Sequence, residues 1–199
     1  MKMSKKLFII SEIFIYFIFI ILDILNINST YIKYLGIIFC FIYSFNSRNK
    51  LFRLSTLFTI IADLFLLVLD SNYELGVTSF IVVQIIYVIL LNGLDTNYFK
   101  QFLFLRLFIL VIGLVILYLT NSLSMLNVLV IIYFSNLFVS AIESFPTKNK
   151  LLFIGLSLFV CCDVCVGLHN LNVSNFIYNF ATFMMWVFYL PSQVLIVLS

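Results

Sequence analysis

The sequence is poor in charged residues. Only 10% of its 199 residues are Asp, Glu, Lys or Arg, whereas a soluble domain carries about 25%. Hydrophobic residues make up 64% of the chain, and the mean hydropathy is +1.22. So few charges cannot cover a water-exposed surface, which excludes a soluble globular protein. The net charge of +3 forms no basic patch, so we expect no nucleic-acid partner.

Glycine and proline are also scarce, with six Gly and two Pro. Transporters often interrupt their spans with such residues, so their scarcity argues mildly against a transporter. No phosphate-binding glycine loop and no nucleophile elbow is present. Alternation of polar and apolar residues is absent from runs such as FIYFIFIIL at 14–22, which excludes a membrane β-barrel. The first apolar run lacks a small-residue cleavage site and is too long for a signal peptide.

What the sequence does contain is a series of apolar runs, most near the ~20 residues needed to cross a bilayer. Charges and clusters of Asn, Ser, Asp and Gly separate them. Because only helices satisfy such backbones in lipid, we predict an all-α polytopic membrane helix bundle, one integral membrane domain over residues 1–199. The eight transmembrane helices are expected at 7–25, 31–45, 51–69, 74–92, 99–119, 123–142, 150–168 and 174–198.

The distribution of positive charge supports this division into eight. With the N-terminus inside, ten of the eleven Lys and Arg residues fall on the inner side, and only Lys33 falls outside. Cytoplasmic loops carry such an excess of Lys and Arg. Adding or removing one helix would place many basic residues on each side of the membrane. We therefore expect both termini in the cytoplasm, in a bacterial plasma membrane.

Two segments of the chain resemble each other. Lys50 precedes Asp63 by thirteen residues, and Lys150 precedes Asp163 by thirteen. At 1.5 Å per residue, each Asp lies ~20 Å beyond its lysine, so both carboxyls are expected near the bilayer midplane. A four-helix duplication of 1–95 and 96–199 would explain the match, and chance in a low-complexity chain is the alternative.

The two aspartates are the main candidates for chemistry. A carboxylate at membrane depth costs several kcal/mol and needs a partner, a wet cavity or a proton. If Asp63 and Asp163 face each other, both cannot ionise easily, and one carboxyl keeps its proton beside an ionised one. This is an arrangement used for acid/base hydrolysis. Alternatively, each Asp forms separate hydrogen bonds with neighbouring helices.

Further polar side chains share helix faces with these positions or with each other. Thr59 lies on the face of Asp63, Gln84 is three residues from Tyr87, and Tyr189 is four from Gln193. We predict that they line a cavity, and interhelical hydrogen bonding is the alternative. On the seventh helix, Gly155 and Gly167 share the face of Asp163, where they permit close approach or serve packing only.

Three acidic residues are expected to be solvated. Glu12 and Asp23 lie nearer the ends of the first helix and are expected to extend to the headgroups. Glu143 is expected to be solvated beside Lys148 and Lys150.

A metal site has little support. Cys161, Cys165 and His169 share a helix face and are residue types that bind zinc. Asp163 points elsewhere and no second cluster supplies ligands, so we expect no metal.

The spacing of these residues resembles the YhhN-like lysoplasmalogenase family of multi-span membrane proteins, over about residues 50–199. The first block of the family pattern is matched by Lys50, Asp63, Gly76, Phe80, Gln84 and Tyr87. The second is matched by Tyr133, Ala141, Gly155, Phe159 and Cys162-Asp163, and the tail by Tyr189, Ser192-Gln193, Leu195-Ile196 and Ser199. Departures are Leu51 for the family Pro, Ala62 and Cys162 for Gly and Ser before the two Asp, Gln84 for His, and Ser192 for Ala.

The resemblance implies hydrolysis of the vinyl ether of a lysoplasmalogen, which gives a fatty aldehyde and glycerophospho-ethanolamine or -choline. Asp63 and Asp163 would act as acid and base, while Gln84, Tyr87, Tyr189, Gln193 and Thr59 would position water or headgroup. The partners implied are the lysophospholipid substrate and membrane lipids, and no metal or organic cofactor is required. Two alternatives remain at this point: a small-solute or proton-coupled transporter, and a noncatalytic lipid-binding membrane protein.

Overall fold

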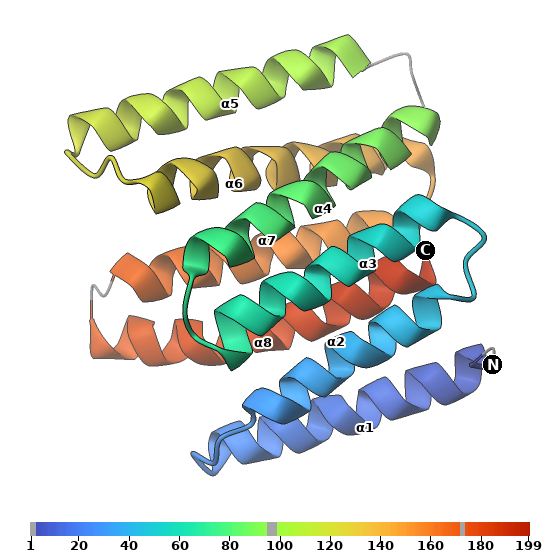
Figure 1. The fold of residues 1–199 in the computed structure, drawn as a ribbon. Helices are drawn as coiled ribbons and strands as arrows, with labels where there is room; N and C mark the ends of the chain where they lie inside the picture. Colours follow the sequence, from blue (N-terminus) through green and yellow to red (C-terminus); the bar gives the residue numbers. More distant parts are fainter. Residues whose placement is uncertain (1–2, 95–98, 172–173) are drawn as a thin grey trace. The chain divides into compact units, whose positions relative to one another are not determined.

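The computed structural model describes residues 3–94, 99–171 and 174–199, and over these residues it contains helices and no strands. The α-helices are α1 (Lys5–Ile24), α2 (Thr30–Ser44), α3 (Lys50–Asp63), α4 (Tyr73–Leu94), α5 (Phe99–Leu119), α6 (Met125–Ser144), α7 (Lys150–Leu171) and α8 (Asn175–Leu198). A π-helical segment, η1 (Leu64–Val68), continues α3, and a short 3-10 turn, η2 (Phe145–Thr147), follows α6 (Figure 1). The predicted all-α fold with eight helices is therefore confirmed.

The helices begin at polar residues that cap their free N–H groups. The side chains of Ser4, Asn49, Ser124 and Ser174 accept hydrogen bonds from backbone N–H groups of α1, α3, α6 and α8. These caps follow the polar clusters that separated the apolar runs. When η1 is counted with α3, the largest difference from the predicted ends is in α7, which was expected to end at 168 and ends at Leu171.

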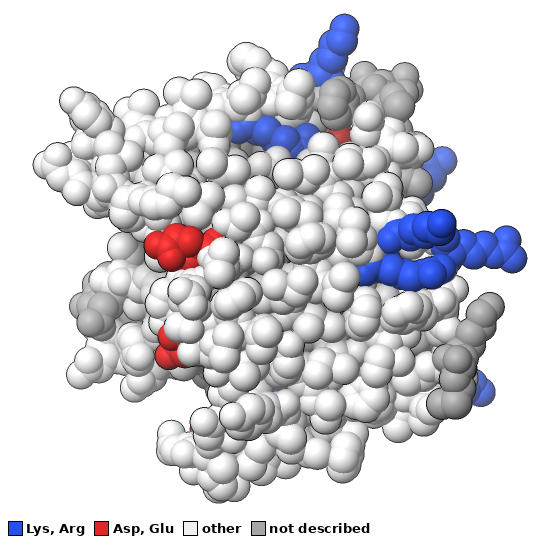
Figure 2. Space-filling view, in the orientation of Figure 1, with Lys and Arg blue, Asp and Glu red and all other residues white. Residues whose placement is uncertain are grey.

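Among the described residues, seven helices are long and apolar enough to cross a membrane. The exception is α2, which has 15 residues and would measure about 22 Å, short of the ~30 Å hydrocarbon core. Large apolar side chains are exposed on the outside, for example Phe14 at 66% and Phe176 at 79%. The surface seen in Figure 2 carries few charged side chains. An apolar exterior of this kind suits lipid, and the chain is an integral membrane protein.

The chain divides into two compact units. Unit 1 comprises residues 1–48 and 150–199, and so contains α1, α2, α7 and α8. Within it, α7 packs along α8, while α2 packs against both α1 and α8. The N-terminal end of α1 and the C-terminal end of α8 lie at the same end of this unit (Figure 1).

Unit 2 comprises residues 49–149 and contains α3 to α6. Here α3 packs on α4, α4 on α6, and α5 on α6. Helix α5 is largely exposed, with Arg106 as a buried exception. The predicted duplication of 1–95 and 96–199 stays a prediction.

Two of the residues expected to be solvated are buried instead. Glu12 is only 3% exposed, and the Cys40 thiol donates to its Oε1 at 3.7 Å. It lies on the buried stripe of α1 because α2 packs over that face. Glu143 is 4% exposed, since it forms an ion pair with the buried Arg106 of α5 rather than facing Lys148 or Lys150.

Candidate functional site

The polar face predicted on α3 is buried within unit 2. Ser55, Thr56, Thr59 and Asp63 are all nearly inaccessible, and Asp63 is 4% exposed. The hydroxyl of Ser55 donates to Phe52 O at 2.8 Å, and that of Thr59 donates to Ser55 O at 3.1 Å. Since a hydroxyl has one proton to donate, Thr59 is left with acceptor capacity only. It can orient a group that donates a hydrogen bond, such as water or a protonated carboxyl.

Asp63 stands where the α-helix changes into a π-helix. It is the last residue of α3, and Leu69 N donates to Leu64 O at 2.8 Å, five residues back. π-Helical turns are rare, and this one ends the helical segment that begins at Lys50. The run LFLLV at 64–68 gives no sequence signal for this turn, so sequence reasoning did not predict it.

Gly76 sets how α4 lies against α3. A Cβ at Gly76 would meet Leu66 Cγ at 2.5 Å and Ala62 O at 3.3 Å. The start of α4 therefore lies at the level of Ala62 and the π turn. Only a residue without a side chain fits there, which explains the glycine in this block of the family pattern.

Gln84 and Tyr87 lie further along α4 and are both buried. Gln84 is eight residues beyond Gly76, roughly 12 Å along the helix, so its depth corresponds to that of Ser55 rather than Asp63. Its side chain is 0% exposed, and no hydrogen-bond partner for its Nε2 or Oε1 is found among the described residues. A buried amide without partners is costly. Its chemistry suits the binding of a small polar molecule such as water.

In unit 1, Asp163 lies on α7 and is half-buried. One turn earlier, the buried Phe159 packs against Tyr189 of α8, with ring centroids 5.4 Å apart. Tyr189 also meets Trp186 edge-on at 5.1 Å. This register places Asp163 near the level of Trp186, about one turn from Tyr189.

Gln193 lies one turn further along α8, away from the level of Asp163. It is buried, and no partner for its Nε2 is found in the part of the chain that the structure describes. Gly155 permits the close contact of α7 with α8 here, because a Cβ on it would meet Ser192 O at 3.1 Å and Ile196 N at 3.1 Å. Gly167 has no atom within 4 Å of its Cβ position, so it does not serve a close approach.

Asp63 belongs to unit 2 and Asp163 to unit 1. Their meeting as a pair therefore stays a prediction, as does a cavity shared by Gln84, Tyr87, Tyr189 and Gln193. What the structure contributes is the surroundings of each aspartate in its own unit.

Glu12 is a further intramembrane carboxyl that the sequence did not identify as buried. It shares the inward face of α1 with Phe8, Ile15 and Phe19. These positions are three or four residues apart, as expected for one helix face. Because nearly every residue of α1 is apolar, the sequence shows no amphipathic pattern from which the inward face could be predicted. Among the described residues, no group of three or more His, Cys, Asp or Glu could hold a metal ion.

Comparison with known proteins assigns the chain to a family. No curated protein and no solved structure matches the chain significantly. The model of the YhhN family matches residues 28–199, a longer stretch than the 50–199 predicted from motifs, since it takes in α2. This match covers most of the chain, which therefore belongs to the YhhN family.

Proposed function

We propose that the protein hydrolyses the vinyl ether bond of lysoplasmalogens within a bacterial plasma membrane. The single observation that carries the proposal is the burial of Asp63, 4% exposed, in a helix that is otherwise mainly apolar. An ionisable residue at such a place is a candidate functional group by default. Family membership and the spacing shared with Asp163 support the same reaction.

The proposed chemistry begins with a proton. One aspartic acid protonates the vinyl carbon β to the ether oxygen, which leaves an oxocarbenium ion at the carbon bearing that oxygen. Water adds there, and the second aspartate takes the proton that water loses. The product of this half of the reaction is a hemiacetal, formed by paired carboxyls much as in glycoside hydrolysis.

Collapse of the hemiacetal restores both carboxyls. The first aspartate, now ionised, accepts the hydroxyl proton, and the second gives its proton to the departing ether oxygen. The carbon–oxygen bond breaks, which releases a fatty aldehyde and glycerophospho-ethanolamine or -choline. Each carboxyl returns to its starting protonation state, so the cycle consumes one water and needs no cofactor.

The buried amides are the proposed water-positioning groups. Gln84 stands where the family pattern has His, and an amide does not transfer a proton near neutral pH as imidazole does. It can still donate and accept hydrogen bonds, and its amide, for which the described residues provide no partner, is suited to hold water. Tyr87, Thr59, Tyr189 and Gln193 would orient water or headgroup in their own units.

The test is incubation of the purified protein with a lysoplasmalogen, followed by measurement of free aldehyde. We expect aldehyde release from the vinyl ether and none from the ester-linked lysophospholipid of equal chain length. Absence of aldehyde above a no-protein control would refute the hydrolase.

The two alternatives predict other results. A transporter predicts solute or proton flux across proteoliposomes with no lipid turnover. A noncatalytic lipid binder predicts neither flux nor turnover, and no change when both aspartates are neutralised.

A further inference from the structure

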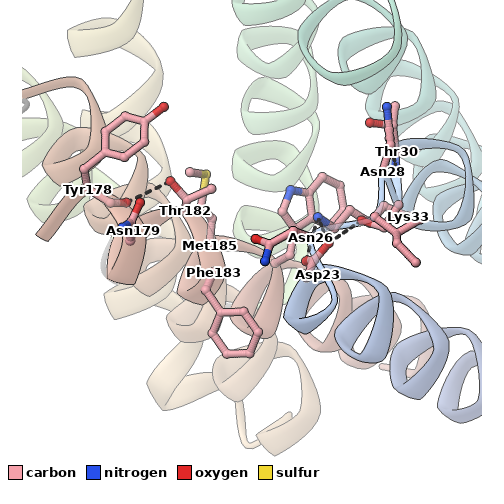
Figure 3. A pocket seen from close by; sticks show the side chains of 13 residues that line it. Asp23, Asn26, Asn28, Thr30, Lys33, Tyr178, Asn179, Thr182, Phe183 and Met185 are labelled. Atoms are coloured by element: carbon pink, nitrogen blue, oxygen red, sulfur yellow. Dashed lines mark hydrogen bonds and ion pairs between the residues drawn. The ribbon is translucent and has the colours of Figure 1, made fainter. Parts of the chain in front are cut away.

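A pocket of about 690 Å³ lies within unit 1, at the end away from the chain termini. One wall is formed by the end of α1, the turn after it and the start of α2, with Asp23, Asn26, Asn28 and Lys33. The opposite wall is the first half of α8 (Figure 3). Its remaining lining residues are Ile27, Ser29, Thr30, Tyr178, Asn179, Thr182, Phe183, Met185 and Trp186.

Both signs of charge are present in this pocket. Lys33 Nζ lies 3.0 Å from Asp23 Oδ1 and 2.8 Å from Asp23 Oδ2, and the two side chains are 12% and 17% exposed. The hydroxyl of Ser29 also donates to the Asp23 carboxylate. The pair is thus held in place while part of each group still faces the pocket.

Lys33 also lies close to two aromatic rings. Lys33 Nζ lies 5.2 Å from the centroid of the Trp186 ring and 5.6 Å from that of Phe19. A cation near such a ring is attracted by its negative face, and Trp186 is one of the residues that line the pocket. Lys33 is also the one basic residue that the predicted topology places outside.

We propose that this pocket binds the zwitterionic headgroup of a lysophospholipid, that is, a phosphodiester carrying an amine. The phosphate would accept from Lys33 and from the side-chain amides of Asn26 and Asn28. The amine would lie against the Asp23 carboxylate and the Trp186 ring, and Phe183 and Met185 would contact the apolar part of the lipid.

Charges of both signs at fixed positions favour the binding of a zwitterion over that of a simple anion. A phosphate without an amine would be attracted by Lys33 but repelled by the carboxylate of Asp23. The position at a helix end suits a group that stays at the membrane surface while its chain enters the bilayer. The inference that the ligand of this pocket is the substrate rests on the proposed function. The inference that the pocket binds a zwitterionic headgroup does not.

Trp186 is the only tryptophan of the chain, so its fluorescence reports this pocket directly. Purified protein in detergent is titrated with ester-linked lysophosphatidylethanolamine, with soluble glycerophosphoethanolamine, and with glycerol 3-phosphate and ethanolamine separately. Equilibrium dialysis of the soluble ligands gives affinities without relying on fluorescence. We expect saturable binding of the zwitterions, and binding of the two fragments at least about tenfold weaker.

The comparison of the two zwitterions identifies the source of the ligand. Tighter binding of the lysolipid assigns the pocket to a lipid, and equal binding assigns it to the free phosphodiester; both outcomes support the chemistry. Binding of either fragment as tight as that of the zwitterion would overturn the proposal, as would no binding at all.

Variants separate binding from a merely structural ion pair. Lys33→Met should weaken binding of glycerophosphoethanolamine about tenfold, and Lys5→Met, which removes a charge at the other end of α1, should not. Thr182→Tyr keeps the ion pair and fills the pocket, so it should weaken binding without lowering the unfolding temperature. Wild-type affinity in both Lys33→Met and Thr182→Tyr would refute the site. Since these ligands contain no vinyl ether, the result does not depend on catalysis.

Discussion

At the residue scale, burial decides what each acidic side chain can do. Asp63 and Glu12 are each less than 5% exposed, yet only Asp63 was identified from the sequence as an intramembrane group. Its position in the middle of an apolar run and its spacing from Lys50 gave the signal. Glu12 gave none, because its burial depends on the packing of α2 against α1, which no local pattern encodes.

The Arg106–Glu143 pair illustrates the same point and gives a prediction. Both groups are buried, and Arg106 also donates to Ser140 Oγ at 3.3 Å. Arg106→Met leaves a buried carboxyl without its cation, which should cost about 3–5 kcal/mol in stability. Thermal unfolding in detergent measures this loss. The double variant Arg106→Met with Glu143→Leu should recover most of it, and a double variant as unstable as the single one would contradict this account.

At the element scale, the chain follows its apolar runs closely. Helix positions could be predicted because several apolar runs begin just after a polar N-cap such as Asn49 or Ser124. The π turn after Asp63 could not, because Leu64–Val68 is uniformly apolar and its hydrogen bonds shift by one residue without any change of composition. The contacts of individual glycines could not be predicted from the sequence either, since Gly155 and Gly167 occupy equivalent positions on the same helix face.

These two glycines form a matched pair on α7. Gly155→Ala places a methyl group 3.1 Å from backbone atoms of α8, and such overpacking should cost about 1–3 kcal/mol. Gly167→Ala meets nothing within 4 Å and should stabilise the helix by up to about 1 kcal/mol. Unfolding temperatures of the two variants test this, and equal effects would show that the α7–α8 contact is looser than described.

At the scale of the whole molecule, the sequence predicted the helix count but not how the helices group. Unit 1 joins the first and last parts of the chain through contacts of α8 with α1 and α2. Such long-range packing leaves no periodic mark in uniformly apolar segments. The orientation in the membrane stays a prediction, which rests on the distribution of Lys and Arg along the chain.

That orientation can be tested in intact cells. In a cysteine-free background, Ser71→Cys should react with a membrane-impermeant maleimide, because it lies between η1 and α4 on the predicted outer side. Ser4→Cys, before α1, should react only after permeabilisation. The reverse pattern of labelling would refute cytoplasmic termini.

The central claim is that Asp63 and Asp163 act together on one vinyl ether. Its most direct test is the rate of aldehyde release by the wild type, by Asp63→Asn, by Asp163→Asn and by the double variant. Each single variant should lose about 10²–10⁴-fold, and the double should lose little more, because groups that act as a unit are not additive. The exposed Glu74→Gln is the matched control and should keep full activity. Full activity in either single aspartate variant would contradict the account.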